Sequence, residues 1–337
     1  MAERPDTYLW YGDSGSGKTA QIGEAAKWEF ARTGMVTELI SSDSGWYPVE
    51  DLVWSESKPF GTMTPSGPVC IQAWNIQYIK NPFPVLIKLS EGAWPRVTAD
   101  AKLSVSAPVK KDGRLVACDG KYLVGQIAIE GLKTIADALM QDHIRNLRKI
   151  AQDIVGDFTD TVVVQTGSQS VPVTEHFGKS AEAHYGQVQD FLLLDLVPRF
   201  GALPVHKIIW TSHEVVGKRK DKDTGIVQSV IGPALIGTAT AQKTAMKFGD
   251  TFHFRVVNTA GKDAPVKNVF RAYWEKQPDS TFKTLYWPAK LSFPLSRMPE
   301  VSAKYPGGYF PLSLETGITE FLDFKYGSLA KVSEVAK

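Results

Sequence analysis

The sequence predicts an α/β fold in which helices cover both faces of a mostly parallel sheet. Two observations predict it. Apolar, strand-like runs alternate with segments of helical periodicity along much of the chain, and the first apolar run leads directly into a glycine-rich phosphate-loop pattern. Sheets of this class bind ligands at the carboxyl ends of their strands. We therefore expect the functional residues to lie where predicted strands end.

Composition limits the class of protein. The chain has 337 residues, of which 43% are hydrophobic and 22% charged, enough for one large α/β domain or two small ones. Its first residues are polar and no apolar stretch approaches the length of a bilayer span, so we expect a cytoplasmic protein without membrane contact. Cys70 and Cys118 lack C-x-x-C spacing, which argues against a disulfide framework or a zinc site. The net charge of +2 gives no bulk attraction to nucleic acid.

The phosphate loop is the most specific motif. It follows the apolar run at 8–11 and matches G-x-x-x-x-G-K-[ST], the pattern whose backbone N–H groups hold nucleotide phosphates between a strand and a helix. Lys18 is expected to reach the β- and γ-phosphates of ATP, and the Thr19 hydroxyl to bind Mg²⁺. The alternative is an ordinary glycine-rich turn. The predicted nucleotide-binding residues are Gly12, Asp13, Ser14, Gly15, Ser16, Gly17, Lys18 and Thr19.

The following elements continue the α/β pattern. A helix should end near Gly34, and residues 36–41 read as the second strand. Periodicity is then lost in a stretch rich in Pro, Trp and Gly, with strand-like runs at 69–74 and 85–89, which we interpret as a β-rich or irregular insertion. Its tryptophans favour packing in a small core, although a nucleobase-stacking surface is the alternative. These residues are Trp46, Trp54, Trp74 and Trp94.

Order returns with a buried strand at 122–129 and a helix whose apolar positions run from Leu132 to Ile150. A polar loop is predicted at 156–184, a helix at 185–199 and a strand at 206–213. A basic turn follows at 218–225, then strands at 251–258, 267–274 and 281–287, and a Pro-rich tail with a short helix near Ile318. The predicted organisation is a core at 1–45 and 121–290, an inserted subdomain at 46–120 and a C-terminal tail at 291–337.

Three residues at strand ends are catalytic candidates together with Lys18. Glu130 ends an apolar strand, where an acid can hold Mg²⁺; alternatively it is an acid favoured by a helix N-terminus. Asp43 follows the second strand, where a carboxylate can polarise water; alternatively it makes a turn. His213 could contact the γ-phosphate, or be structural. Beyond it, the chain's most obvious polyanion-binding patch, or else a solvated hairpin tip, is formed by Lys218, Arg219, Lys220 and Lys222.

The order of these pieces resembles the RecA-like ATPases encoded by bacteriophages, which are similar to a minimal RecA/Rad51 core and are associated with single-strand annealing and recombination. The resemblance covers about 12–44 and 122–257 and includes the segment 232–237, Gly-Pro-Ala-Leu-Ile-Gly. It implies that Asp43 activates water, that Glu130 is the magnesium acid and that His213 senses the γ-phosphate. It also implies a site completed by a neighbouring subunit's cation, for which Lys243, Lys247 and Arg255 are candidates. Two departures stand out: Asp43 is shorter than the usual glutamate, and Gly131 replaces the usual serine.

The sequence and this resemblance together predict an enzyme that binds and hydrolyses Mg²⁺-ATP and acts on single-stranded DNA, in the host cytoplasm if the chain is phage-encoded. A homo-oligomer or filament, and a phage protein partner, would fit such an enzyme. One alternative is a nucleotide-binding switch or assembly module with little turnover. Another is a nucleotide or small-molecule kinase, although arginines for a lid are sparse after the phosphate loop.

Overall fold

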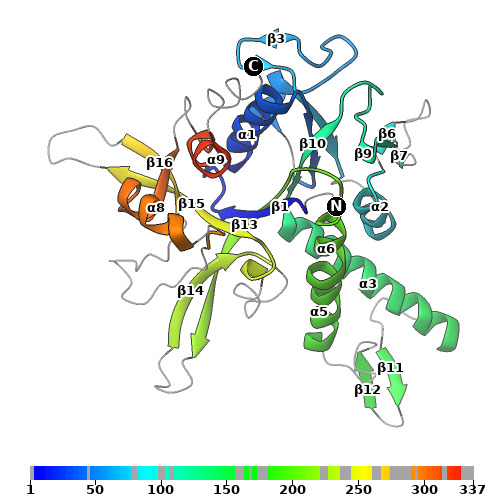
Figure 1. Ribbon diagram of the computed structural model, residues 1–337. Coiled ribbons are helices and arrows are strands. Elements are labelled where there is room, and N and C mark those ends of the chain that lie inside the picture. The colour runs from blue at the N-terminus through cyan, green and yellow to red at the C-terminus, as the bar shows by residue number, and fades with distance from the viewer. Residues whose placement is uncertain are drawn as a thin grey trace.

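The structure, a computed structural model, describes residues 4–43, 46–76, 82–93, 95–97, 103–105, 110–155, 163–166, 169–172, 181–220, 227–235, 244–259, 267–273, 290–292, 295–312 and 317–327. Within these ranges, none of the helices combines the length and the apolar character that crossing a membrane requires. Figure 1 shows a central sheet with helices on its two sides.

A mainly parallel sheet forms the centre of the described chain, which confirms the predicted α/β class. Its main path runs in the order β17, β16, β15, β1, β13, β10, β2, β5. The strands from β15 to β5 pair in parallel, whereas β16 and β17 add antiparallel pairs at one edge and β14 pairs antiparallel with the far part of β13. The strand bounds are β1 Asp6–Gly12, β2 Val36–Ser41, β5 Ile71–Asn75, β10 Val124–Glu130, β13 Lys207–Lys220, β14 Val227–Pro233, β15 Asp250–Thr259, β16 Lys267–Tyr273 and β17 Tyr309–Leu312.

The register of the parallel strands brings the predicted site residues together on the side of the sheet toward which the parallel strands run. Gly12, the last residue of β1, lies opposite His213 of β13. Glu130, the last residue of β10, lies opposite Ser41 of β2. Because β13 lies between β1 and β10, the end of the phosphate-loop strand and Glu130 flank the strand that carries His213.

Alternation along β1 explains why helices cover both faces. Tyr8 and Trp10 belong to one buried hydrophobic cluster, and Leu9 between them belongs to another on the opposite face. The first cluster includes residues of α1, α8 and α9, and the second includes residues of α2, α3 and the segment 188–200. The helix bounds are α1 Lys18–Thr33, α2 Pro82–Ser90, α3 Leu132–Val155, α5 Ala181–Asp190, α6 Val197–Phe200, α8 Met298–Lys304 and α9 Thr319–Tyr326, with a π-helical turn η2 at Phe191–Leu196 and 3₁₀ turns η1 at Tyr47–Leu52 and η4 at Leu295–Arg297.

Several predicted elements lie where the sequence indicated. The helix after the phosphate loop ends at Gly34, whose φ of 70° allows its N–H to bond the Phe30 carbonyl. The second strand, the strand before Glu130, the helix after it and the short helix after Ile318 are also present. The strand predicted at 206–213 is β13, but it continues to Lys220, because β14 pairs with its far part; His213 therefore does not end the strand, and residues 218–220 of the predicted basic turn belong to it. The predicted strand at 281–287 and Trp94 lie outside the described residues.

Two local predictions were wrong. The apolar run at 85–89 is the helix α2, in which Leu86 and Leu89 are buried three residues apart, because so short a run fits either structure until its packing is known. The predicted loop at 156–184 contains an antiparallel pair, β11 Val163–Thr166 with β12 Gln169–Pro172, and the start of α5.

The ranges predicted as an insertion and a tail contribute to the central layers. β5, within 46–120, pairs with β2 in the main sheet, and Val69 and Leu115 belong to the same cluster as Leu9. Trp54 packs against Phe60, ring centroids 6.0 Å apart, as the core interpretation expects. The rest of this range holds small hairpins, β3 Met63–Thr64 with β4 Gly67–Pro68, β6 Pro95–Val97 with β7 Leu103–Val105, and β8 Lys110–Lys111 with β9 Arg114–Leu115. In the tail, β17 joins the sheet and α9 packs on the β1 face.

Candidate nucleotide site

The phosphate loop favours glycine at three positions, at two for its backbone conformation and at one for lack of space. Gly15 and Gly17 have φ values of 74° and 87°, in the left-handed region, and Gly17 precedes the first residue of α1. A Cβ on Gly12 would lie 2.1 Å from the carbonyl oxygen of Phe254 on the neighbouring strand. Each motif glycine therefore has a conformational or steric reason in this fold.

A cavity of about 540 Å³ opens beside this loop. It brings all four catalytic candidates, Lys18, Asp43, Glu130 and His213, to one place, together with most of the motif. Its volume is in the usual range for small-molecule sites. The lining residues are Ser14, Gly15, Ser16, Gly17, Lys18, Thr19, Ala20, Ser42, Asp43, Pro48, Glu130, Thr134, Thr211 and His213.

The Lys18 ammonium is held by the loop that it follows. It donates to the carbonyls of Gly12 and Asp13, each at 2.9 Å, and to Ser16 Oγ at 3.1 Å. Burial lowers the pKa of Lys18, while the carboxylates of Glu130 and Glu214 act in the opposite direction. An anion among these donors would satisfy both the lysine and the amides at the start of α1.

Thr19 and Glu130 meet directly. The Thr19 hydroxyl donates to Glu130 Oε1 at 2.6 Å, and Glu130 Oε2 is buried without a hydrogen-bond partner among the described residues. Burial raises the pKa of the Glu130 carboxyl to about 7; the Thr19 hydrogen bond lowers it and the charge of Asp43 raises it further.

A hydroxyl beside a carboxylate with an unsatisfied buried oxygen is a donor set suited to Mg²⁺, which prefers oxygen ligands and takes few of them from the protein. Clusters of three or more His, Cys, Asp or Glu able to hold a metal do not occur in the described part of the chain. The set fits an ion held jointly with phosphates better than an ion caged by protein alone.

Asp43 is held at the cavity by a residue that the sequence analysis missed. Thr134, in the first turn of α3, donates to Asp43 Oδ1 at 2.9 Å. The second carboxylate oxygen lies 3.8 Å from His213 Nε2, and both side chains are partly exposed to the cavity. Thr134 lies four residues after Glu130, but only the packing of α3 brings it to Asp43.

The glycine after Glu130 has a steric cause. Gly131 has a φ of 84°, and a Cβ there would lie 2.1 Å from Ser42 Oγ and 2.7 Å from Asp43 Oδ1. Ser42 Oγ itself donates to the Glu130 carbonyl at 2.8 Å. A serine at 131 would therefore displace the segment that carries Asp43.

A second set of residues that the sequence did not reveal lies behind the loop. Glu214, next to His213, accepts a hydrogen bond from Nε2 of the buried His253 ring, with 2.7 Å between Oε2 and Nε2. The His253 ring stacks on Tyr11, centroids 4.7 Å apart. Burial lowers the pKa of His253. The registers of β1 with β13 and with β15 bring these residues together. No local sequence pattern indicates those registers.

Of the cationic candidates whose side chains the structure describes, neither Lys247 nor Arg255 lines the cavity. Lys218, Arg219 and Lys220 lie on β13 beyond His213, in the hairpin with β14 that extends away from the sheet in Figure 1. Lys247 is exposed and Arg255 is partly exposed. Lys222 and Lys243 fall outside the described residues.

Comparison with known proteins adds little to this geometry. No family model and no curated protein matches the chain. A solved structure, the flagellar accessory protein FlaH from Methanocaldococcus jannaschii, is similar with a TM-score of 0.33 and 10% sequence identity, over 80% of this chain and 78% of that one. At this TM-score the likeness assigns neither a fold family nor an activity to the chain.

Proposed function

We propose that the chain is a Mg²⁺-dependent ATPase with a RecA-like core. The observation that carries this proposal is the single cavity in which the phosphate loop meets three polar residues of neighbouring parallel strands. They are Glu130 at the end of β10, Asp43 just after β2 and His213 within β13. An ordinary glycine-rich turn would not require these groups to converge. Hydrolysis does require them, since the phosphates, the metal and the attacking water each need a partner.

The chain's own residues divide the work by position. The loop amides and Lys18 bind the phosphates, and Thr19 with Glu130 would hold Mg²⁺, which neutralises phosphate charge when bound. Asp43, fixed by Thr134 and open to the cavity, is placed to accept a proton from water. His213 lies 3.8 Å from Asp43 Oδ2, where it can orient that carboxylate or contact the terminal phosphate.

Single-stranded DNA is the proposed partner. Support comes from the continuity of β13, which carries His213 at the cavity and then Lys218, Arg219 and Lys220 in the projecting hairpin. A change at His213 can therefore be passed along one strand to a basic arm. We further propose that the protein assembles into a homo-oligomer or filament, and that it acts in the cytoplasm.

The test compares ATP binding with phosphate release in wild type, Asp43→Asn and a control, Asp195→Asn, which changes an acid on the turn η2 that is 44% exposed. We expect Asp43→Asn to bind Mg²⁺-ATP normally and to lose turnover by about 100-fold or more, because general-base catalysis contributes on that order. The control should match wild type. Binding without turnover in wild type would favour the nucleotide switch, and turnover that survives Asp43→Asn would remove the assigned base.

A second arm adds single-stranded DNA. Turnover should rise, and DNA binding should weaken steeply with salt because phosphate contacts release counterions. An ATPase indifferent to DNA would retain the nucleotide site and overturn the DNA partner.

A further inference from the structure

A second cavity, of about 480 Å³, lies at the amino-terminal ends of β1 and β13, on the side of the sheet opposite to the phosphate loop. Asp6 and Lys207, the first residues of β1 and β13, line this cavity. The C-terminal half of α1 and Tyr326 at the end of α9 line it as well. Because β1 and β13 are parallel, this side of the sheet is separated from Gly12 by the length of β1, roughly 20 Å for seven extended residues. The two cavities are therefore distinct sites.

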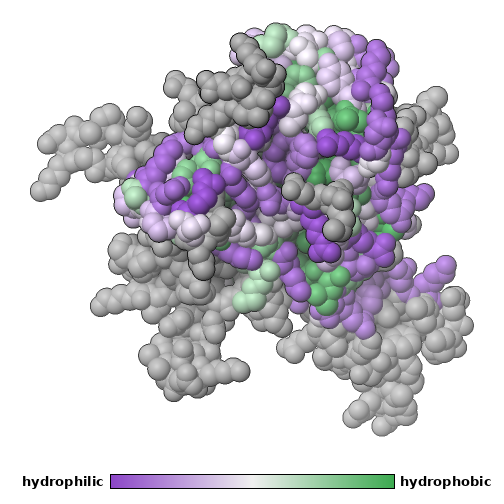
Figure 2. All heavy atoms as spheres, viewed as in Figure 1, coloured by the Kyte–Doolittle hydropathy of each residue, from purple (hydrophilic) through white to green (hydrophobic). Residues whose placement is uncertain are grey.

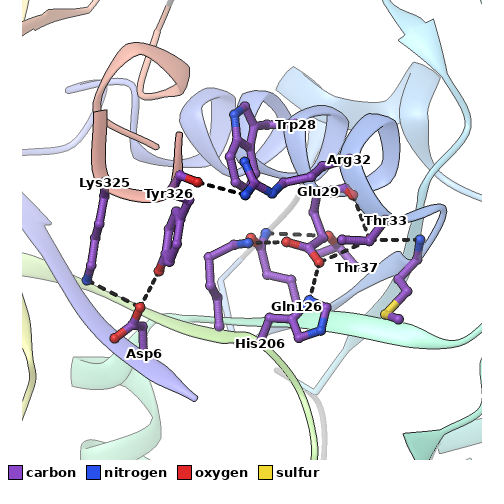
Figure 3. A network of polar contacts seen from close by, with 12 residues as sticks. Asp6, Trp28, Glu29, Arg32, Thr33, Thr37, Gln126, His206, Lys325 and Tyr326 are labelled. Atoms are coloured by element: carbon purple, nitrogen blue, oxygen red, sulfur yellow. Dashed lines mark hydrogen bonds and ion pairs between the residues drawn. The ribbon is translucent and has the colours of Figure 1, made fainter. Parts of the chain in front are cut away.

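The floor of this cavity is a buried ion cluster that is complete without a ligand (Figure 3). Glu29 accepts hydrogen bonds from His206 Nδ1 at 2.6 Å, from Thr33 Oγ1 at 3.1 Å and from the buried Lys207 ammonium. Burial by itself would raise the pKa of Glu29, but the bonds from His206 and Lys207 outweigh burial and lower it. The charge of Glu29 is thus already neutralised within the protein.

The other carboxylate at the cavity is also occupied. Asp6 accepts from the Tyr326 hydroxyl and lies 3.4 Å from the Lys325 ammonium, as Figure 3 shows. Neither Asp6 nor Glu29 therefore offers a free negative charge to balance a further cation on this side of the sheet.

Two arginines at the cavity have no carboxylate partner among the described residues. The Arg32 guanidinium is fixed by the carbonyls of Tyr326 and Gly327, each at 2.7 Å, and lies 4.9 Å from the centre of the Trp28 ring. Arg4 is exposed at the rim. In the coloured part of Figure 2, hydrophilic residues lie among smaller hydrophobic areas. The cavity thus combines a preorganised guanidinium with a second, adaptable one.

We propose that this cavity binds a small anion that bears a phosphate or carboxylate group, held by Arg4 and Arg32. Guanidinium groups recognise both oxyanions through paired N–H donors, and a guanidinium held by backbone carbonyls needs little reordering to bind. The ligand approaches His206, whose side chain is 39% exposed beside the cavity. This site does not depend on the proposed ATPase activity.

The test uses the full chain carrying Lys18→Ala, so that phosphate does not bind through the loop lysine. Inorganic phosphate and citrate are titrated separately by calorimetry, and the resonances of the chain's six histidines are followed by NMR. We expect one site and a shift of the His206 signal that is larger than that of His213 at the first cavity. Binding of phosphate alone would assign a phosphorylated ligand, and binding of citrate as well would extend the class to carboxylates.

Further variants in the Lys18→Ala background test whether Arg4 and Arg32 bind the anion. Arg4→Ala should weaken binding by about three- to tenfold, as expected for one partly exposed charged contact. The control Arg145→Ala, on α3 with a side chain 51% exposed, should not change affinity. Arg32→Gln should weaken binding more; because Arg32 also holds the end of α9, its folding is checked by melting first. Absence of binding by both probes, or unchanged affinity in Arg4→Ala, would overturn the proposal.

Discussion

Replacing Glu130 by glutamine should stabilise the ligand-free protein above neutral pH while removing the negative charge that we propose binds Mg²⁺. Burial raises the pKa of this carboxyl from 4.5 to about 7 in the folded chain. Between these two pH values the folded protein keeps a proton on Glu130 that the unfolded chain has released. The free energy of unfolding therefore falls as pH rises through this window, because the folded state binds more protons.

The size of the effect follows from the two pKa values. At about 1.36 kcal/mol per pKa unit, raising the pKa from 4.5 to about 7 corresponds to about 3 kcal/mol of stability lost by pH 8. Glutamine has no proton to lose and still offers an oxygen to the Thr19 hydroxyl. For a chain of this length, about 3 kcal/mol corresponds to a melting temperature higher by roughly 5 °C in the variant.

The assay is a pair of melting curves at pH 5 and pH 8 for wild type and Glu130→Gln, with Asp195→Asn as the exposed-acid control. The variant should melt close to wild type at pH 5 and several degrees above it at pH 8. Adding Mg²⁺-ATP should raise the melting temperature of wild type more than that of the variant. A difference that is absent, or equal at both pH values, would refute the inference that buried charge on Glu130 destabilises the free protein.

Three further predictions concern neighbouring groups. Gly131→Ser should lower stability by about 1–3 kcal/mol, measured by denaturant unfolding, because its φ is 84° and its Cβ meets the Asp43 segment; an unchanged midpoint would contradict this. Thr134→Val should reduce ATP turnover several-fold and leave ATP affinity unchanged, because it frees Asp43 Oδ1; an equal loss of affinity would argue against a positioning role. Lys325→Met should lower the stability of the fold by about 3 kcal/mol in thermal melts, because it removes the cation that lies 2.6 Å from the buried Asp250 carboxylate. Adding Asp250→Asn should restore much of the lost stability. If it restores none, the loss does not come from the unpaired Asp250 charge.

The parts of the site that the sequence predicted are those set by local rules. The phosphate loop is recognised from the spacing of its glycines, lysine and threonine along the sequence. Asp43, Glu130 and His213 lie at or just after the ends of apolar runs that could be recognised as buried strands. Their convergence followed from the general behaviour of parallel sheets. The cavity confirms that they lie together, while their roles stay predictions.

The parts that could not be predicted depend on long-range packing. Thr134 reaches Asp43, and His253 reaches Glu214, only after three-dimensional registers are set. The run at 85–89 became a helix because Leu86 and Leu89 found a core on one side. Residues 71–75, within the range expected to be an inserted subdomain, form β5 of the central sheet, and no local pattern reports that pairing.

Calorimetric titration of Mg²⁺-ATP into wild type and Lys18→Ala tests the central claim most directly. If the phosphates of ATP lie in the cavity of the phosphate loop, wild type binds one ATP per chain and the variant binds at least about tenfold more weakly, because one charged contact to phosphate is lost. Equal affinity in the two proteins, or no binding to wild type, would contradict the assignment of this cavity as a nucleotide site.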